Sequence, residues 1–239
     1  MRRFFAPKKS FRDGLVTLSE EESHHLRDVL RLGVGDDVHI YDGEGREFAA
    51  CVTSVHKHKA TLRIGDEVPP SSPESPLALT LAAALLKGDK FDLVVQKAAE
   101  LGVTKLVPLY SVRCAVRKTD ISNRMVRWHR IAQASTRQSG RAQNMKIADP
   151  EGLREFLEVC DPESTILFSE RDGRRLPQDF AGKKMTALVG PEGGWDDAEL
   201  EFAKSLGLKI VTLGGRVVRA ETAAIAVTAI LLHRFGDIN

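Results

Sequence analysis

The sequence ALVGPEGGW occupies residues 187–195 of this chain, and LGGRVVRAETA occupies residues 213–223. Each stretch adjoins a short apolar run, as expected of a loop that leaves the end of a buried strand. Glycine lets the main chain approach a ligand closely, because it has no side chain. Taken alone, either stretch is equally well interpreted as an ordinary tight turn. Together, the two predict a pocket for a flat, polar small molecule, lined by backbone groups.

The residues around these stretches alternate between strand and helix patterns. Strand-like apolar runs occur at 77–86, 105–110, 165–169, 185–189 and 209–213, and helix-like patterns at 89–101, 122–138, 196–206 and 222–235. This alternation predicts an α/β fold with a mainly parallel sheet and helices on both faces. Ligands of such sheets bind beyond the carboxyl ends of the strands. The loops after residues 168, 189 and 213 have that position.

A proline-rich segment divides the chain. Residues 69–76 contain four prolines, which can neither continue a helix nor occupy a central strand. We therefore predict a first domain at residues 1–70, a linker at 71–76 and a second domain at 77–239.

The first domain has mostly strand patterns. They lie at residues 37–41, 47–55 and 60–64, with polar turns between them. One helix precedes them, and a capping box formed by Ser19 and Glu22 marks its start. A small β-barrel with one helix is expected.

Composition limits the class of protein. The chain has 239 residues, of which 42% are hydrophobic and 28% charged, as in ordinary globular proteins. No apolar run reaches the roughly 20 residues of a membrane span, and the basic N-terminus lacks the apolar core of a secretion signal. The three cysteines are far apart and predict neither disulfides nor a zinc site. We expect a cytoplasmic protein with no metal and no membrane partner.

Positive charge is concentrated in residues 113–141. This segment holds seven arginines and one lysine against a single aspartate. A solvated helix face is one interpretation of such a run. The excess of arginine over lysine favours the other interpretation, which is recognition of nucleic-acid phosphates and bases.

Several kinds of ligand site are excluded by the motifs. The chain has no G-x-x-x-x-G-K-[ST] phosphate loop, and residues 190–194 do not match G-x-G-x-x-G. It also lacks a G-x-S-x-G elbow and an H-E-x-x-H helix. A nucleoside-type ligand without phosphate remains, bound near Arg216 and Arg219. S-adenosylmethionine fits, because backbone groups can bind adenine and ribose, and a helix N-terminus or an arginine can bind its carboxylate.

Further motifs run along the whole chain. They are RFF at residues 3–5, HHLRDVLR at 24–31, Lys87 with KAAELGV at 97–103, QSGR at 138–141, and the two glycine-rich stretches. In this order they resemble the RsmE family of 16S ribosomal RNA uridine-N3 methyltransferases, of the SPOUT superfamily. The chain differs at Val112, where the family often has an acidic residue, and at Ala220, where it often has threonine.

The resemblance implies a fold and a function. The fold would be an N-terminal PUA-like RNA-binding barrel and a SPOUT-type parallel sheet with a deep C-terminal trefoil knot. The protein would be a homodimer that uses S-adenosylmethionine to methylate N3 of a specific uridine in 16S rRNA, within the 30S subunit.

Site residues follow from the motifs. Cofactor contacts are expected from Leu188, Val189, Gly190, Pro191, Glu192, Gly193, Gly194, Leu213, Gly214, Val218, Thr222 and Ala223. RNA contacts are expected from Arg2, Arg3, His25, Arg27, Arg31, Arg113, Arg117 and Gln138. A surface without an RNA partner is the alternative for those in the first domain.

The chemistry requires loss of the proton on uracil N3. An arginine cannot accept that proton but stabilises the developing anion, and we expect Arg219 and Arg141 to do so. Glu221 is the candidate base, or else it stabilises the N-terminus of the last helix. Two other functions stay open: ribose 2′-O-methylation by a SPOUT-type enzyme, and RNA binding without catalysis during ribosome assembly.

Overall fold

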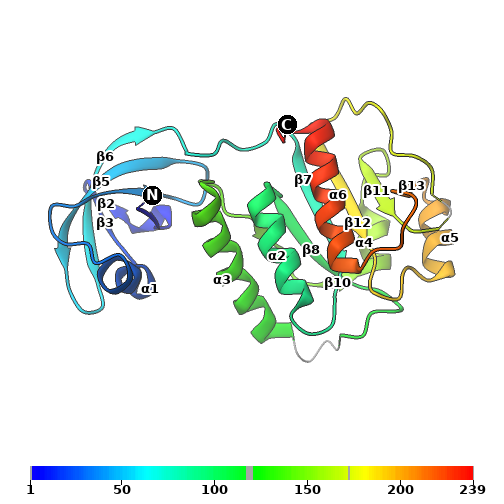
Figure 1. The fold of residues 1–239 in the computed structure, drawn as a ribbon, viewed down its shortest axis with the longest axis horizontal. Helices are drawn as coiled ribbons and strands as arrows, with labels where there is room; N and C mark the ends of the chain where they lie inside the picture. Colours follow the sequence, from blue (N-terminus) through cyan, green and yellow to red (C-terminus); the bar gives the residue numbers. More distant parts are fainter. Residues whose placement is uncertain (1, 117–120, 172, 239) are drawn as a thin grey trace. The chain divides into compact units, whose positions relative to one another are not determined.

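The computed structural model describes residues 2–116, 121–171 and 173–238 (Figure 1). The chain forms two compact units. The first comprises Met1–Glu74 with Gln133–Asn144, and the second comprises Ser75–Ala132 with Met145–Asn239.

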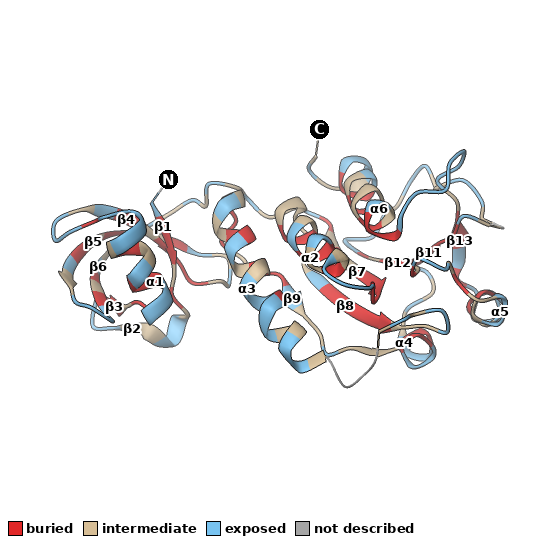
Figure 2. Ribbon diagram, turned by 60° about the horizontal axis from the view of Figure 1, so that its bottom comes forward, coloured by how far each residue is buried: buried red, intermediate tan, exposed pale blue. Residues whose placement is uncertain are grey.

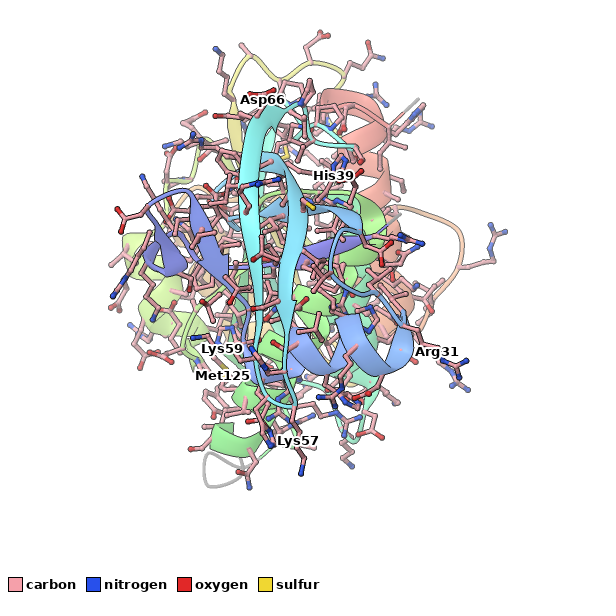
Figure 3. The ribbon with its side chains drawn as sticks, turned by 90° about the vertical axis from the view of Figure 1, so that its left-hand side faces the viewer. Arg31, His39, Lys57, Lys59, Asp66 and Met125 are labelled. Atoms are coloured by element: carbon pink, nitrogen blue, oxygen red, sulfur yellow. The ribbon has the colours of Figure 1, made fainter. Side chains whose placement is uncertain are left out.

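The first unit is built on one sheet, whose strand order is β1-β4-β5-β6-β3-β2. The strands are β1 (Arg3–Phe5), β2 (Phe11–Arg12), β3 (Leu15–Thr17), β4 (Asp37–Tyr41), β5 (Glu47–Val55) and β6 (Ala60–Val68). All neighbours pair antiparallel except β1 and β4, which are parallel. Figure 3 shows the long β5–β6 hairpin, with Lys57 and Lys59 at its turn and Asp66 towards its other end. The three strands predicted from sequence are present.

The helix of this unit begins as predicted but not through a full capping box. Ser19 Oγ accepts a hydrogen bond from Glu22 N at 3.2 Å at the start of α1 (Glu20–His24). The Glu22 carboxylate does not return to the Ser19 backbone. It accepts hydrogen bonds from Phe5 N and the Arg137 guanidinium instead, and the charged bond to Arg137 is the stronger kind. The helix continues as a π-helical turn, His25–Val29.

The second unit is an α/β fold with a parallel sheet, as predicted. The strand order is β10-β8-β7-β12-β11-β13, and β9 also pairs with β8. The strands are β7 (Ala78–Ala84), β8 (Lys105–Tyr110), β9 (Lys146–Ile147), β10 (Glu151–Gly152), β11 (Thr165–Phe168), β12 (Lys184–Val189) and β13 (Lys209–Val211). The helices are α2 (Lys90–Leu101), α4 (Leu153–Val159), α5 (Asp197–Ser205), α6 (Ala220–Phe235) and the first part of α3 (Ile121–Ser139), whose residues from Gln133 onwards belong to the first unit. The sequence analysis missed β9, β10 and α4, which are too short for a clear period.

Helices cover both faces of this sheet. Along β7, Leu79 and Leu81 pack into one apolar cluster with α2, α3 and α6, while Ala82 and Ala84 pack into a second cluster with α4 and α5. This alternation follows from the two-residue period of a strand. Figure 2 shows β7 and β8 buried along most of their length. No helix in the described ranges is both long and apolar enough to span a bilayer.

The register aligns the carboxyl ends of four strands. Val189 of β12 lies opposite Ala83 of β7 and Phe168 of β11, and Phe168 lies opposite Val211 of β13. The loops that follow these strands therefore leave the sheet at one edge. This alignment brings the two glycine-rich stretches together.

The first unit contains a buried ion pair. Arg3 Nη2 lies 2.7 Å from Glu47 Oε2, and the two side chains are 2% and 0% exposed. Arg3 also donates to the carbonyl oxygens of Arg137 and Arg141, and His39 Nδ1 lies 2.9 Å from Glu47 Oε1. Burial raises the pKa of the Glu47 carboxyl, but the hydrogen bonds and charges of Arg3 and His39 outweigh burial, so the pKa lies below its ordinary value.

Glu47→Gln is expected to lower the free energy of unfolding by about 3–5 kcal/mol at pH 7, because the Arg3 guanidinium would be left buried without its counter-charge. Since folding lowers the pKa of Glu47, its stabilisation is complete above pH 4.5 and is lost as the pH falls through the lowered value. Urea unfolding between pH 3 and pH 7 measures both effects. The exposed Arg46–Glu67 pair provides the control, and Glu67→Gln should cost at most about 1 kcal/mol. Equal effects from the two variants would contradict the prediction.

Candidate active site

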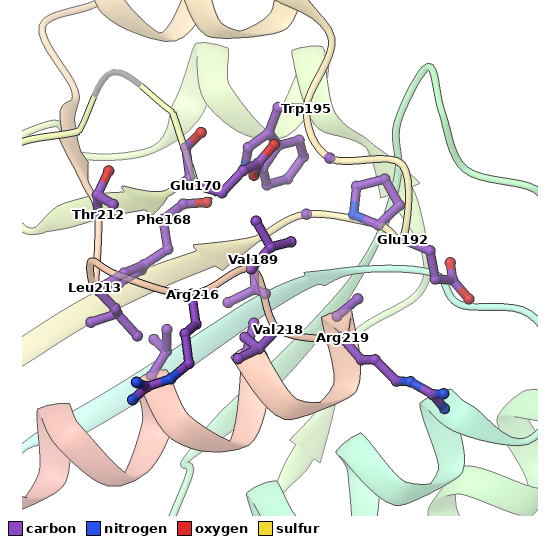
Figure 4. Close-up of a pocket in the computed structure, with 18 of the residues that line it drawn as sticks. Phe168, Glu170, Val189, Glu192, Trp195, Thr212, Leu213, Arg216, Val218 and Arg219 are labelled. Carbon is purple, nitrogen blue, oxygen red and sulfur yellow. The ribbon is translucent and has the colours of Figure 1, made fainter.

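A cavity of about 720 Å³ opens at the edge where the strand ends align. Its walls come from residues 168–170, 189–195 and 212–220, with Lys90, Ala223 and Val227 (Figure 4). This volume is in the range of small-molecule sites, roughly 300–1,000 Å³. The cavity thus lies between the segments that follow β11, β12 and β13.

The first glycine-rich loop is anchored by Trp195, which is 1% exposed. Its indole Nε1 donates to the Phe168 carbonyl at 2.9 Å. A Cβ at Gly190 would lie 3.1 Å from the Trp195 ring, so a side chain there would fit only if the indole moved by a few tenths of an ångström. Gly194 has φ +68° and closes the turn with a bond from its N–H to the Pro191 carbonyl.

Two arginines hold the same loop from outside. Arg113, after β8, donates to Gly193 O at 3.1 Å and to Asp196 Oδ2 at 3.2 Å. Arg171, after β11, donates to Trp195 O at 2.9 Å and lies 2.9 Å from Asp197 Oδ1. Asp196 also caps α5. Side chains from neighbouring strand ends therefore fix a loop whose own backbone faces the cavity.

Glu192 is the acidic residue of this loop. Its Oε1 accepts from Lys90 Nζ at 3.0 Å and from Lys87 N at 3.3 Å. Burial raises the pKa of Glu192, but these hydrogen bonds outweigh burial and hold the pKa below its ordinary value. The Glu192 carboxylate is thus bound to Lys87 and Lys90, which follow β7.

The second glycine-rich loop carries two cations that have no ion-pair partner among the described residues. Gly214 and Gly215 have φ of +83° and +69°, and a Cβ at either position would have nothing within 4 Å. Arg216 and Arg219 line the cavity and are exposed. Within the described residues, neither guanidinium forms an ion pair. Both are therefore available to an anion.

The N-terminus of α6 faces the cavity through Ala220 and Ala223. Arg219 is the N-cap, and no side chain caps the first turn. Glu221 in that turn is 9% exposed and is not a lining residue, and its Oε2 has no hydrogen-bond partner among the described residues.

The structure brings together most of the residues predicted to bind a small molecule. The predicted residues that line the cavity are Val189, Gly190, Pro191, Glu192, Gly193, Gly194, Leu213, Gly214, Val218, Arg219 and Ala223. Leu188 is buried in the cluster under α4 and α5, and Thr222 does not line the cavity.

Other predicted residues lie in the first unit. Arg141 is 2% exposed and its Nη2 is 2.7 Å from Glu74 Oε2, so both Arg141 and Arg3 are enclosed by ion pairs there. Arg2 pairs with Asp36, and Arg27 with Asp28. Burial, followed by the charges of Arg137 and His24, lowers the pKa of His25.

The other residues predicted to contact RNA lie on the surface or outside the described residues. Arg31 is exposed at the end of the π-helical turn, with φ 55° (Figure 3), and Gln138 is exposed on α3. Arg117 lies outside the described residues. The RNA contacts proposed for these side chains stay predictions.

The sequence analysis missed the third wall, formed by Phe168, Ser169 and Glu170. The position of this loop after a strand was recognised, but it contains no glycine motif. Lys90, Trp195 and Thr212 were also missed as lining residues. No group of three or more side chains suited to a metal occurs in the described parts of the chain.

Comparison with known proteins identifies the family. Residues 73–232 match the model of an RNA methyltransferase domain, and residues 18–65 match an RNA methyltransferase PUA domain. The ribosomal RNA small subunit methyltransferase E of Synechocystis is 34% identical over 88% of this chain and 70% of its own length. That of Rickettsia conorii is 30% identical over 88% of this chain and 86% of its own.

A solved structure agrees along the full length. Ribosomal RNA small subunit methyltransferase E from Neisseria gonorrhoeae, bound to S-adenosyl methionine, matches with a TM-score of 0.91 and 34% identity, covering 100% of both chains. The chain belongs to the ribosomal RNA small subunit methyltransferase E family. The resemblance inferred from the motifs is confirmed, and so are the parallel α/β sheet and the PUA-like N-terminal domain.

In this methyltransferase, Arg171→Ala is expected to loosen residues 190–197. The variant loses a charged hydrogen bond to Trp195 O and the ion pair with Asp197. Because the side chain is 41% exposed, we expect a loss of about 1 kcal/mol in local opening free energy, or about fivefold faster amide exchange. Hydrogen exchange read by mass spectrometry measures it. Arg154→Ala, at an exposed pair on α4, should leave the exchange rates of these amides unchanged. Equal exchange in both variants would contradict the proposed role of Arg171 in holding this loop.

Proposed function

We propose that this protein transfers a methyl group from S-adenosylmethionine to N3 of one uridine in 16S rRNA. The observation that carries the proposal is a cavity that two glycine-rich loops and the N-terminus of α6 form together, with Arg219, which has no ion-pair partner among the described residues, at its wall. This chain belongs to a family whose members are named ribosomal RNA small subunit methyltransferases. A cavity of this kind in such a chain supports methyl transfer to that RNA.

The residues of the cavity fit this methyl donor. Backbone groups around Gly190 and Gly214 are open to an adenine and a ribose, and the side chains of Phe168, Val189 and Val227 supply apolar contact. The uncapped first turn of α6 suits the methionyl carboxylate. When bound, the donor supplies an electrophilic methyl group on a sulfonium, which needs no metal.

Arg219 is proposed to stabilise the uridinate. Uracil N3 is a poor nucleophile until its proton leaves, and a cation beside the base favours the anion. Arg219 is exposed, lines the cavity and has no ion-pair partner in the described residues. Arg141 is also proposed to stabilise the uridinate, although its guanidinium is paired with Glu74 in the first unit.

A trefoil knot is proposed for the second unit. β13 is the edge strand of the sheet, yet α6, which follows it, packs on α2, β7 and β12. The intervening residues 212–219 must therefore run back across the sheet edge beside the loop at 190–195. A knotted passage of this kind is rare in proteins.

The assembly and setting are also proposed. α6 is apolar nearly all round, but Ile225, Ala226, Ala229 and Ile230 remain partly or fully exposed, which supports a homodimer that covers them. The 30S subunit is proposed as the form of the substrate and the cytoplasm as the location. The domains proposed are residues 1–70 and 77–239, with the linker at 71–76.

Product analysis tests the reaction. The purified protein, incubated with 30S subunits and S-adenosylmethionine, should produce one 3-methyluridine in 16S rRNA. Mass spectrometry of nucleosides detects it, and reverse transcriptase should stop there because N3 methylation blocks pairing. A 2′-O-methylated nucleoside would instead indicate ribose methylation. Absence of S-adenosylmethionine binding by calorimetry would indicate an RNA-binding protein without catalysis.

Glu221 is proposed as the base, and Glu221→Gln tests it. Loss of a general base lowers turnover by about 10²–10⁴-fold, while cofactor affinity should change little, because the carboxylate would act on the uracil proton and not on the methyl donor. Single-turnover methylation and calorimetry measure the two quantities, with the exposed Glu201→Gln of α5 as control. Full activity in Glu221→Gln would assign the carboxylate to stabilising the N-terminus of α6 instead.

A further inference from the structure

The third wall of the cavity contains a carboxylate without an assigned role. Glu170 follows β11 by two residues and lines the cavity beside Phe168 and Ser169. In Figure 4, Glu170 lies on the same side of the pocket as Trp195, across from Val218 and Arg219.

Glu170 is held in place by its neighbours. Arg171 Nε lies 3.6 Å from Glu170 Oε1, while the rest of that guanidinium binds Trp195 O and Asp197. A Cβ at Gly194 would lie 2.7 Å from the same Oε1. The absence of a side chain at Gly194 therefore makes room for the carboxylate against the loop.

The carboxylate has unused capacity as an acceptor. The distance of 3.6 Å to Arg171 Nε is too long for a hydrogen bond, and no described residue donates one to Glu170. The side chain is 39% exposed, and a carboxylate offers about four acceptor positions. The other carboxylate of the cavity, Glu192, is already occupied by Lys90 and by Lys87 N.

The charges across the cavity decide which part of the methyl donor reaches Glu170. The open N–H groups in the first turn of α6 attract the methionyl carboxylate. The amino-acid end should then lie on that side, and the nucleoside end towards Glu170. A pair of vicinal ribose hydroxyls supplies two donors, which match the two oxygens of an acidic side chain, as in dinucleotide sites.

We infer that Glu170 accepts hydrogen bonds from the ribose hydroxyls of the methyl donor and so selects a ribose over a deoxyribose. The inference rests on the proposed function, namely that the cavity binds S-adenosylmethionine. Arg171 is then a positioning residue, because it holds both the carboxylate and the loop carbonyl of Trp195.

Calorimetry with three ligands tests the role of Glu170. S-adenosylhomocysteine carries both the ribose and the amino acid. 5′-Methylthioadenosine carries the adenine and the ribose without the amino acid, and its 2′,3′-dideoxy analogue also lacks the two ribose hydroxyls. Each is titrated into the full chain and into Glu170→Gln, with the exposed Glu163→Gln as a matched control in the same unit. Thermal unfolding checks that each variant is folded.

The expected result is an equal loss of affinity for the two ligands that carry the ribose hydroxyls. Glu170→Gln should bind S-adenosylhomocysteine and 5′-methylthioadenosine more weakly by the same factor, about tenfold, as for one charged hydrogen bond. The dideoxy analogue should bind both proteins equally, and Glu163→Gln should behave as the unmodified chain. If Glu170→Gln does not fold, the unmodified chain still supplies the test, because it should bind the dideoxy analogue at least tenfold more weakly than 5′-methylthioadenosine.

Two results would overturn the inference alone. A loss confined to S-adenosylhomocysteine would assign Glu170 to the ammonium group of the amino acid, and equal affinity of all ligands for both proteins would assign it no contact. A purely structural role would weaken the dideoxy analogue as much as the others, and this too would overturn it. Failure of the unmodified chain to bind S-adenosylhomocysteine would instead overturn the proposed function, and the inference with it.

Discussion

The hydrogen bond from the Trp195 indole to the Phe168 carbonyl is the contact on which the site depends. It ties the loop after β12 to the end of β11, and the buried ring lies so close to Gly190 that a Cβ there would be a tight contact at 3.1 Å. The bond is possible only because the parallel register ends both strands at the same level. The position of the cavity is thus a consequence of strand register, and its backbone lining a consequence of the glycines.

Charged side chains reinforce this arrangement. Arg113 follows β8, Arg171 follows β11 and Lys90 begins α2, and each binds the loop at residues 190–197. These three side chains form ion pairs with Glu192, Asp196 and Asp197. Arg216, Arg219 and Glu170 keep their binding capacity, so the loop is rigid while the wall stays available to a ligand and a substrate.

The first unit uses arginine differently. Arg3 was predicted to contact RNA and Arg141 to stabilise the uridinate, yet both residues are 2% exposed and bound to carboxylates. A buried charge without a partner is costly. Arg3 also joins the sheet to residues 133–144 of the same unit through hydrogen bonds to the carbonyl oxygens of Arg137 and Arg141. Both motif arginines of this chain therefore hold the first unit together.

Local sequence was enough to predict the order of the long elements, the parallel α/β class, the family and half of the residues that line the cavity. The elements and the class follow from periodicity, the cavity lining from the glycine-rich stretches and the family from the motifs along the chain. The wall at residues 168–170, the clamps by Arg113 and Arg171, and the burial of Arg3, Arg141 and Glu221 emerged only from the folded chain. The reason is physical: whether a charged side chain faces solvent, a ligand or a counter-charge depends on neighbours from distant strand ends. Register and packing set those neighbours, and no local pattern of residues records them.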